Sequence, residues 1–504
     1  MNIRDVTQEM AEQLRPEMVK ALASGFTTAL GLTGYELEAP AKNLFPVLAP
    51  FRNSVTRRRA PIGAPAANWK AITAINPGNA NPFPGFGFAG NVIETETANF
   101  TAAYQVMALG NTVQLDAQIQ AQAFQDLKAT AGINTLYALM IAEDKALLGA
   151  QNFALQVPGT ITLAKATTGG SITYVATTGT NVWVSVAART MFGYFNGGAS
   201  QSSTPQTVAL TSGETTDKVT ASVPAVRGAV CYDWYVGQGT ASAASAYYYY
   251  GTTTVNTVAI TAVPSSDNTL SALPELAAQA GYATVSAGDT SANSAAFNGL
   301  LASCAGDWLN GALVTHGTAS ATPSGAYFLS LDGAAFTAQT GGILEIDEVL
   351  LQLWNQARIS PTRMLVNAQQ HQDVTNALYA SGAAYTLFRP DQLAERQGFL
   401  GGALLEAYLN KAMNGRPIPI ETHPHVPDGT VIMISEQLPY PDNQVSNVFE
   451  VETQMEYTQI DYATNRAAGS LGGPRYDFEV RAQEVFKNYF PAGCAVISNV
   501  GHGA

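Results

Sequence analysis

A block of short alternating segments at residues 157–268 constrains the fold of this chain more than any other feature. The block is rich in Val, Thr, Tyr, Ser and Gly, which favour strands and turns, and it is poor in helix formers. A helix-forming segment precedes it and a mixed segment follows, so we interpret the block as an all-β domain inserted into an α+β scaffold. Alternation predicts strands at 160–165, 171–176, 181–188, 206–211, 217–223, 228–236, 246–250 and 253–262.

The number and spacing of these segments are typical of an immunoglobulin-like sandwich. Trp234 is expected to lie buried in its core. Cys231 has no second cysteine nearby, and the remaining two, Cys304 and Cys494, are distant, so the likeness is architectural and no disulfide framework is expected. The run Tyr247–Tyr250 predicts a strand that packs on both faces, with an exposed sugar-binding surface as the alternative.

The scaffold around this block divides into segments of different character. Residues 1–60 predict an amphipathic helix at 5–30 and then an extended arm, and residues 61–110 predict a long loop whose strand-like flanks enclose a Pro/Gly-rich tip. Residues 111–156 predict a long helix that stops at Gly149. Residues 269–339 are a loop-rich connection, residues 340–444 alternate helices with short strands, and residues 445–504 predict long closing strands.

The composition points toward association with other copies. Charged residues make up only 12% of the 504 residues, about half the usual share. Charges are depleted at interface cores, so this composition favours a protein that buries surface against itself, with a low-charge monomer as the alternative. The net charge of −13 argues against a dedicated nucleic-acid binder. The start Met-Asn-Ile-Arg-Asp lacks an apolar segment, so no signal peptide is expected. No apolar run in the chain approaches the roughly 18 residues that a membrane helix needs, so no membrane helix is expected either.

The order of these segments resembles the tailed-phage major capsid family, with its Hong Kong ninety-seven type fold. Three stretches carry the resemblance: Ile141–Gly149 at the end of the long helix, Ala357–Asn367, and Tyr476–Ala492. The resemblance covers most of the chain outside 157–268. It implies an N-terminal arm, an extended loop, a spine helix, a peripheral domain built from that helix and the closing strands, and an axial domain at 340–444.

The resemblance also implies a function. Subunits of such a protein form the hexamers and pentamers of an icosahedral shell around double-stranded DNA, without reading its sequence. Portal, scaffolding and decoration proteins are the implied partners, the virion is the implied location, and assembly takes place in the host cytoplasm. The crosslink between a lysine and an asparagine that some relatives make is not carried over, and only about forty residues precede the arm, so no large cleaved segment is expected.

Residues of the arm and the extended loop are the candidates for contact between subunits. An arm with apolar anchors but without periodicity suits docking on a neighbour, and an aromatic loop tip suits augmentation of one. The candidates are Phe45, Phe51, Arg57, Arg58, Arg59, Trp69, Lys70, Phe83, Phe86 and Phe88. The basic run Arg57–Arg59 is interpreted as a contact with a neighbour or with the inner wall.

The remaining motifs favour ordinary structure over chemistry. Gly85–Gly90 reads G-x-G-x-x-G, but no strand precedes it and no helix follows, so a flexible tip is expected in place of a cofactor site. His423 and His425, with Asp428 nearby, are interpreted as surface histidines in a turn and not as metal ligands. No catalytic motif is present, so we expect no enzyme, cofactor or metal. An encapsulin-like shell and a modular adhesin are the rival functions.

Overall fold

The computed structural model describes residues 44–502 except for gaps at 62, 76–82, 84–85, 91, 122–124, 243–246, 265–288, 306, 310–311, 315–324, 381–404, 414, 441 and 463–474. The helices expected at 5–30 and 275–280 lie outside the described residues. The chain divides into two compact units, one of Met1–Pro46, Thr112–Ile133 and Tyr462–Asp477, the other of Val47–Asn111, Asn134–Asp461 and Phe478–Ala504. Together the elements make a mixed α+β fold.

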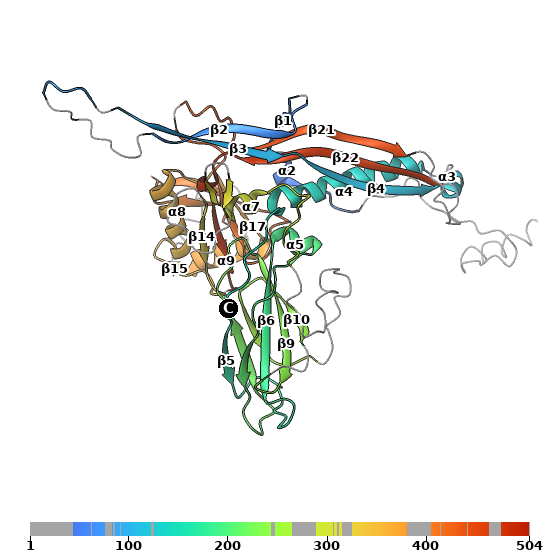
Figure 1. Cartoon of the computed structure of the whole chain (residues 1–504), viewed down its shortest axis with the longest axis vertical. Helices are drawn as coiled ribbons and strands as arrows, with labels where there is room; N and C mark the ends of the chain where they lie inside the picture. Colours follow the sequence, from blue (N-terminus) through green and yellow to red (C-terminus); the bar gives the residue numbers. More distant parts are fainter. Residues whose placement is uncertain are drawn as a thin grey trace, which may run out of the picture. The chain divides into compact units, whose positions relative to one another are not determined.

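The all-β domain is a sandwich of two antiparallel sheets (Figure 1). One sheet has the order β11-β8-β5 and the other the order β10-β9-β6-β7. With strands lettered in chain order, these sheets are GDA and FEBC, whereas an immunoglobulin constant domain has ABED and CFG. The strands are β5 (Thr162–Ala166), β6 (Asn181–Arg189), β7 (Gln206–Ala209), β8 (Lys218–Ser222), β9 (Cys231–Gly239), β10 (Tyr248–Thr253) and β11 (Thr257–Ile260).

Side chains from both sheets close the core of the sandwich. Trp234 is fully buried there, as expected, among residues such as Val184 of β6 and Val219 of β8. Tyr249 packs on the opposite face of its sheet against Tyr235, while Tyr250 contacts the sandwich core. The prediction that the tyrosine run packs on two faces is therefore confirmed. The segment expected as a strand at 171–176 forms isolated bridges only.

A six-stranded mixed sheet forms the centre of the scaffold, in the order β14-β23-β20-β17-β19-β18. It draws on residues outside 340–444, because β14 and β23 pair with each other in parallel and β23 also pairs with β20. The strands are β14 (Tyr327–Ser330), β17 (Arg363–Val366), β18 (Ala407–Asn410), β19 (Arg416–Thr422), β20 (Val431–Ile434) and β23 (Ala495–Ser498).

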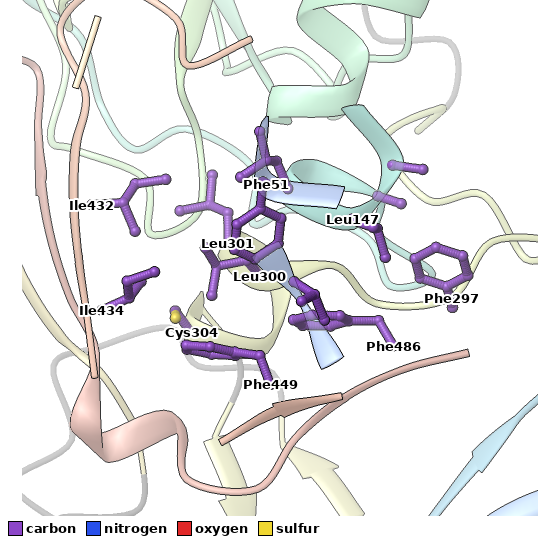
Figure 2. Close-up of a cluster of buried hydrophobic side chains, with 14 of the residues drawn as sticks. Phe51, Leu147, Phe297, Leu300, Leu301, Cys304, Ile432, Ile434, Phe449 and Phe486 are labelled. Carbon is purple, nitrogen blue, oxygen red and sulfur yellow. The ribbon is translucent and has the colours of Figure 1, made fainter. Parts of the chain in front are cut away.

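Both faces of this sheet are covered, so successive residues of its central strands enter different cores. Leu365, Ile432 and Val496 belong to a core that includes α4 and α7 (Figure 2). Val366 and Met433 belong instead to the core beneath α8 and α9. Burial on both faces explains why these strands read as continuous apolar runs. The helices are α4 (Leu127–Gly149), α7 (Leu300–Ala305), α8 (Leu344–Ala357) and α9 (Ala368–Ala380).

Helix α8 shows how local sequence sets these elements. Its apolar residues recur at helical spacing and are buried, at Ile346, Val349, Leu350, Leu353 and Ala357. Acidic residues in its first turn complement the helix dipole. The helix ends at Arg358, which takes a left-handed conformation (φ 55°) and donates its amide to the Trp354 carbonyl.

The long helix expected within residues 111–156 is interrupted in the structure. Strand β4 (Gln105–Gln114) extends past its expected start, and α3 (Leu115–Ala121) precedes α4. Asp126 caps α4, because its Oδ1 accepts from the amides of Lys128 at 3.0 Å and Ala129 at 3.2 Å. The stop at Gly149 is confirmed, and a Cβ there would lie 2.6 Å from the Met191 Cβ.

The closing strands are confirmed as two long strands, β21 (Phe449–Tyr462) and β22 (Arg475–Asn488). They lie in a four-stranded sheet of order β1-β21-β22-β4, where β1 (Thr56–Arg59) pairs in parallel with β21. The short helix α2 (Pro50–Ser54) precedes β1, and α5 (Met191–Asn196) follows β6. The shorter elements are β12 (Asp307–Leu309), β13 (Ala312–Val314), β15 (Ala338–Gln339), β16 (Gly342–Ile343) and η1 (Pro491–Gly493).

Candidate functional site

The flanks of the extended loop form a two-stranded ribbon (Figure 1). Strand β2 (Ala66–Ile75) pairs antiparallel with β3 (Thr95–Ala103), from Ala66 opposite Ala103 to Ile75 opposite Thr95. In the part of the chain that the structure describes, these two strands pair only with each other. Both outer edges of the ribbon therefore offer backbone donors and acceptors to a third strand.

The outer part of the ribbon and the loop it carries expose large apolar side chains. Phe86 is fully exposed, and Phe88 is 76% exposed. Ile72 and Ile75 on β2 and Val92 and Ile93 before β3 are also exposed. Phe83 and Lys70, two further candidates from the sequence, are exposed as well. A soluble monomer rarely presents so many apolar side chains together, and such a surface marks a contact site.

The base of the ribbon, by contrast, is fixed to the chain itself. Trp69 stacks on Phe100 with ring centroids 5.6 Å apart and meets the edge of Tyr489 at 5.8 Å. The Lys487 ammonium lies 6.0 Å from the Trp69 ring. Trp69, a candidate for contact between subunits, therefore anchors the ribbon within its own chain.

A buried ion network lies under this base. The Lys487 ammonium is 2.8 Å from a Glu450 oxygen and 2.6 Å from a Glu452 oxygen, and the Tyr104 hydroxyl donates to Glu452 at 2.6 Å. Burial works to raise the pKa of Glu452, but the hydrogen bonds from Lys487 and Tyr104 outweigh it and the pKa is lowered. The network holds β21, β22 and the ribbon's base in one arrangement.

The arm residues divide into one exposed and one buried anchor. Phe45 is 69% exposed. Phe51 is 1% exposed and packs between Phe449 and Phe486, with centroids 6.4 and 6.2 Å away (Figure 2). Phe51 thus contributes to the chain's own core, and its ring is not available to a neighbour in this conformation.

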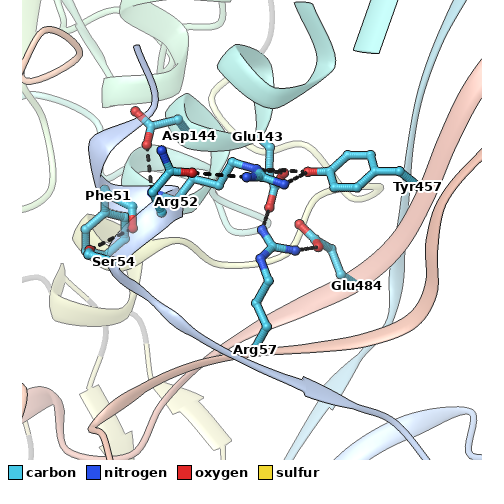
Figure 3. Close-up of polar contacts among 9 residues, drawn as sticks. Phe51, Arg52, Ser54, Arg57, Glu143, Asp144, Tyr457 and Glu484 are labelled. Carbon is cyan, nitrogen blue, oxygen red and sulfur yellow. Dashed lines mark hydrogen bonds and ion pairs between the residues drawn. The ribbon is translucent and has the colours of Figure 1, made fainter. Parts of the chain in front are cut away.

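The basic run is also divided between two uses. Arg58 and Arg59 are exposed on β1. Arg57 instead forms ion pairs with Glu143 of α4 and with Glu484 of β22, the latter at 3.2 Å (Figure 3). Arg52 pairs with Glu143 at 2.7 Å. The two arginines therefore fasten the segment that carries α2 and β1 to the chain's own helix and closing strand.

The electrostatics of this arginine cluster are unusual, because it contains two buried carboxyl groups side by side. Glu143 and Glu484 share Arg57, and neither is exposed. Burial raises the pKa of Glu484 to about 8, and the neighbouring Glu143 adds to that effect, while Arg57 opposes it. The cluster therefore favours the protonated form of Glu484 more than water does.

The two histidines of the turn after β19 do not lie on the surface, which corrects the expectation from sequence. His423 is 2% exposed, and the His425 side chain is 11% exposed. The nearby carboxylate is Asp144 of α4, whose Oδ2 lies 2.5 Å from the His425 Nδ1. Asp428 contacts His502 instead, at 2.8 Å. The distance of 279 positions between Asp144 and His423 left no local signal of this cluster.

The glycine-rich loop has no helix after it. Gly87 has a φ of 85°, and the residues that follow run into β3 at Thr95. No helix N-terminus therefore stands where a dinucleotide site would need one for the pyrophosphate. Among the described residues, no helix is both long and apolar enough to cross a bilayer.

Comparisons with known proteins give similar solved structures but no relatives by sequence. No family model matches the chain, and no curated protein matches it. A capsid structure of cyanophage A-1(L) is 10% identical, with a TM-score of 0.46, and the match covers 94% of this chain and 98% of that one. The capsid of a native GTA particle is 8% identical at a TM-score of 0.41, covering 95% and 99%.

The encapsulin of Synechococcus elongatus PCC 7942 is also similar, at 8% identity and a TM-score of 0.39, covering 94% of this chain and 95% of that one. All three TM-scores lie below 0.5, so they assign no function by themselves. The functional argument rests on the ribbon, the arm and the charge pattern of the chain.

Proposed function

We propose that this chain is a structural major capsid protein, which assembles with copies of itself into hexamers and pentamers of an icosahedral phage shell. The single observation that carries the proposal is the β2–β3 ribbon, with two open edges and an exposed apolar end. A neighbouring copy is the occupant that we propose for this surface.

The open edges and exposed apolar side chains of the ribbon favour a partner. An isolated two-stranded ribbon is marginally stable in water, because each strand buries little and leaves one edge open. A neighbouring copy that lies under the ribbon removes its apolar side chains from water and pairs with its edges. The rigid base supports this use, because Trp69 and the Lys487 network fix the direction in which the ribbon leaves the chain.

The composition supports the same proposal. Only 12% of residues are charged, so the surfaces that copies would bury carry little desolvation cost. The net charge of −13 suits a wall that encloses DNA without adhering to it. Location in the virion, assembly in the host cytoplasm, and portal, scaffolding and decoration proteins as partners are further parts of this proposal.

The test is assembly of the full chain, expressed alone and compared with a double variant at the ribbon's end, Phe86→Ser with Phe88→Ser. Burying a Phe side chain contributes about 1.5–3 kcal/mol, so the double variant should weaken each contact by about 3–6 kcal/mol. We expect closed particles, tubes or capsomers from the unaltered chain under electron microscopy, and smaller species from the double variant. Val175→Ser, at an exposed apolar position of the sandwich, is the matched control and should assemble normally.

The outcomes separate the rival functions. Uniform closed particles that form without other proteins and enclose protein cargo would favour an encapsulin-like compartment. Capsomers or tubes that close only with a scaffolding protein would favour the capsid. A chain that stays monomeric at high concentration would remove both shell functions and leave the adhesin.

A further inference from the structure

Three potential ligand atoms converge where helix α4 meets the turn after β19. Asp144, His423 and His425 each offer one ligand atom, and these three atoms lie within 4.8 Å of one another. Asp144 Oδ2 is 3.5 Å from the His423 nitrogen and 2.5 Å from the His425 nitrogen. The three side chains come from two segments far apart in sequence, so the fold brings them together.

The cluster is buried and contains an unsatisfied polar atom. Asp144 is fully buried and His423 is 2% exposed. Nε2 of His423 is buried, faces Asp144 and has no hydrogen-bond partner. A buried polar nitrogen without a partner is costly, so such an atom in a native fold needs an explanation, and a bound ion is one.

Surrounding contacts hold the candidate ligands in place. The second oxygen of Asp144 accepts from the backbone amide of Arg52 at 2.8 Å (Figure 3). The Phe195 ring packs perpendicular to the His425 ring, with centroids 6.1 Å apart. Supporting contacts of this kind orient the ligand side chains and contribute to the affinity of a metal site.

We propose that Asp144, His423 and His425 form a binding site for one divalent transition-metal ion of the zinc class. Two imidazole nitrogens and one carboxylate oxygen suit zinc, cobalt or nickel, whereas calcium and magnesium require mainly oxygen ligands. Three protein ligands leave a fourth tetrahedral position, which a water molecule would fill. This inference does not depend on the proposed function.

Binding requires a defined local change. Tetrahedral ligands at zinc distances lie roughly 3.3 Å apart, so Asp144 and His425 must separate from their present 2.5 Å. The backbone amide of His425 now donates to Nδ1 of His423 at 3.1 Å. Ligation through Nε2 moves the ring proton to Nδ1, so this amide contact must lengthen. In return, the ion satisfies Nε2 and joins α4 to the histidine turn.

The test is metal binding by the untagged full chain after it has been stripped with EDTA. Titration with zinc chloride should saturate at one ion per chain, and cobalt should give the visible absorption bands of a tetrahedral site. Asp144→Asn keeps the acceptor for the Arg52 amide and His425→Asn removes a ligand at the partly exposed position. Each should weaken zinc binding at least tenfold.

His502→Asn is the matched control, because His502 also lies against two carboxylates, Asp373 at 3.0 Å and Asp428 at 2.8 Å. It should leave zinc binding unchanged. Absence of a saturable site in the unaltered chain would overturn the proposal, and so would an equal loss in His502→Asn and His425→Asn. Because His425→Asn changes a partly exposed residue, the proposal stays testable even when Asp144→Asn fails to fold.

Discussion

Replacing Glu484 by Gln tests the electrostatics of the arginine cluster. Glutamine resembles the protonated acid, since its oxygen still accepts from Arg57 and its amide still donates toward Glu143. The pKa of Glu484 is about 8 in the folded chain, against 4.5 for the free group. Each tenfold change in proton affinity corresponds to about 1.4 kcal/mol, so this difference is worth on the order of 5 kcal/mol.

The direction of the pH effect follows from proton binding. Between pH 4.5 and about 8 the unfolded chain has released this proton and the folded chain has kept it, so raising the pH favours unfolding. The contribution of Glu484 to the free energy of unfolding is therefore fully present below pH 4.5 and is lost as the pH rises to about 8. Above that, both states are ionised and the loss is complete.

The assay is thermal unfolding of the unaltered chain and Glu484→Gln from pH 5 to 9, in EDTA. The free energies of unfolding of the two proteins should be close at pH 5. At pH 8 they should differ by several kcal/mol, with the variant more stable. Glu456→Gln, at an exposed position of β21, is the control and should track the unaltered chain. Parallel loss of stability in the Glu484 variant and the unaltered chain across this range would refute the reasoning.

Three further substitutions probe other parts of the fold. Phe51→Ala removes a ring buried between two others and should destabilise the full chain by about 3–5 kcal/mol in denaturant unfolding, whereas Phe45→Ala at an exposed position should change it little. Asp233→Ala leaves the buried Arg189 guanidinium without its ion pair and should lower the free energy of unfolding of the sandwich by about 3–5 kcal/mol. A decrease of less than about 1 kcal/mol would contradict a buried pair. Gly299→Ala places a Cβ 2.5 Å from the Ala146 carbonyl oxygen and should lower the melting temperature, while Gly213→Ala, where the space is open but φ is 81°, should show a smaller loss.

The sequence predicted those helices and strands well that are determined by the pattern of neighbouring residues. The strands of the sandwich follow from period-two alternation, and Trp234 and the tyrosine run were placed correctly because burial there follows from that alternation. The long helix was predicted with few breaks and without a position for any of them, and Asp126 is a capping residue that starts a second helix within it. A cap is visible in sequence, so this break had a signal.

Contacts between distant segments left no such signal. The pairing of β14 with β23 joins residues 327–330 to 495–498. The hydrophobic pattern of either segment does not indicate which distant strand it pairs with. Arg57 was interpreted as a contact with a neighbour or with the inner wall, because nothing near it in sequence reveals Glu143 or Glu484. The histidine turn was placed on the surface because Asp144 could not be known as its neighbour.

The position of β23 has a consequence for the chain during its synthesis. All strands of the sandwich are contiguous in sequence, from Thr162 to Ile260, so that domain has every residue it needs while the ribosome is still translating the rest. The six-stranded sheet has no such independence, because β23 at Ala495–Ser498 lies between β14 and β20. A polypeptide that stops before β23 therefore has a finished sandwich and an unfinished sheet, in which β14 has no partner and β20 pairs only with β17. Only a chain that includes β23 can close that sheet.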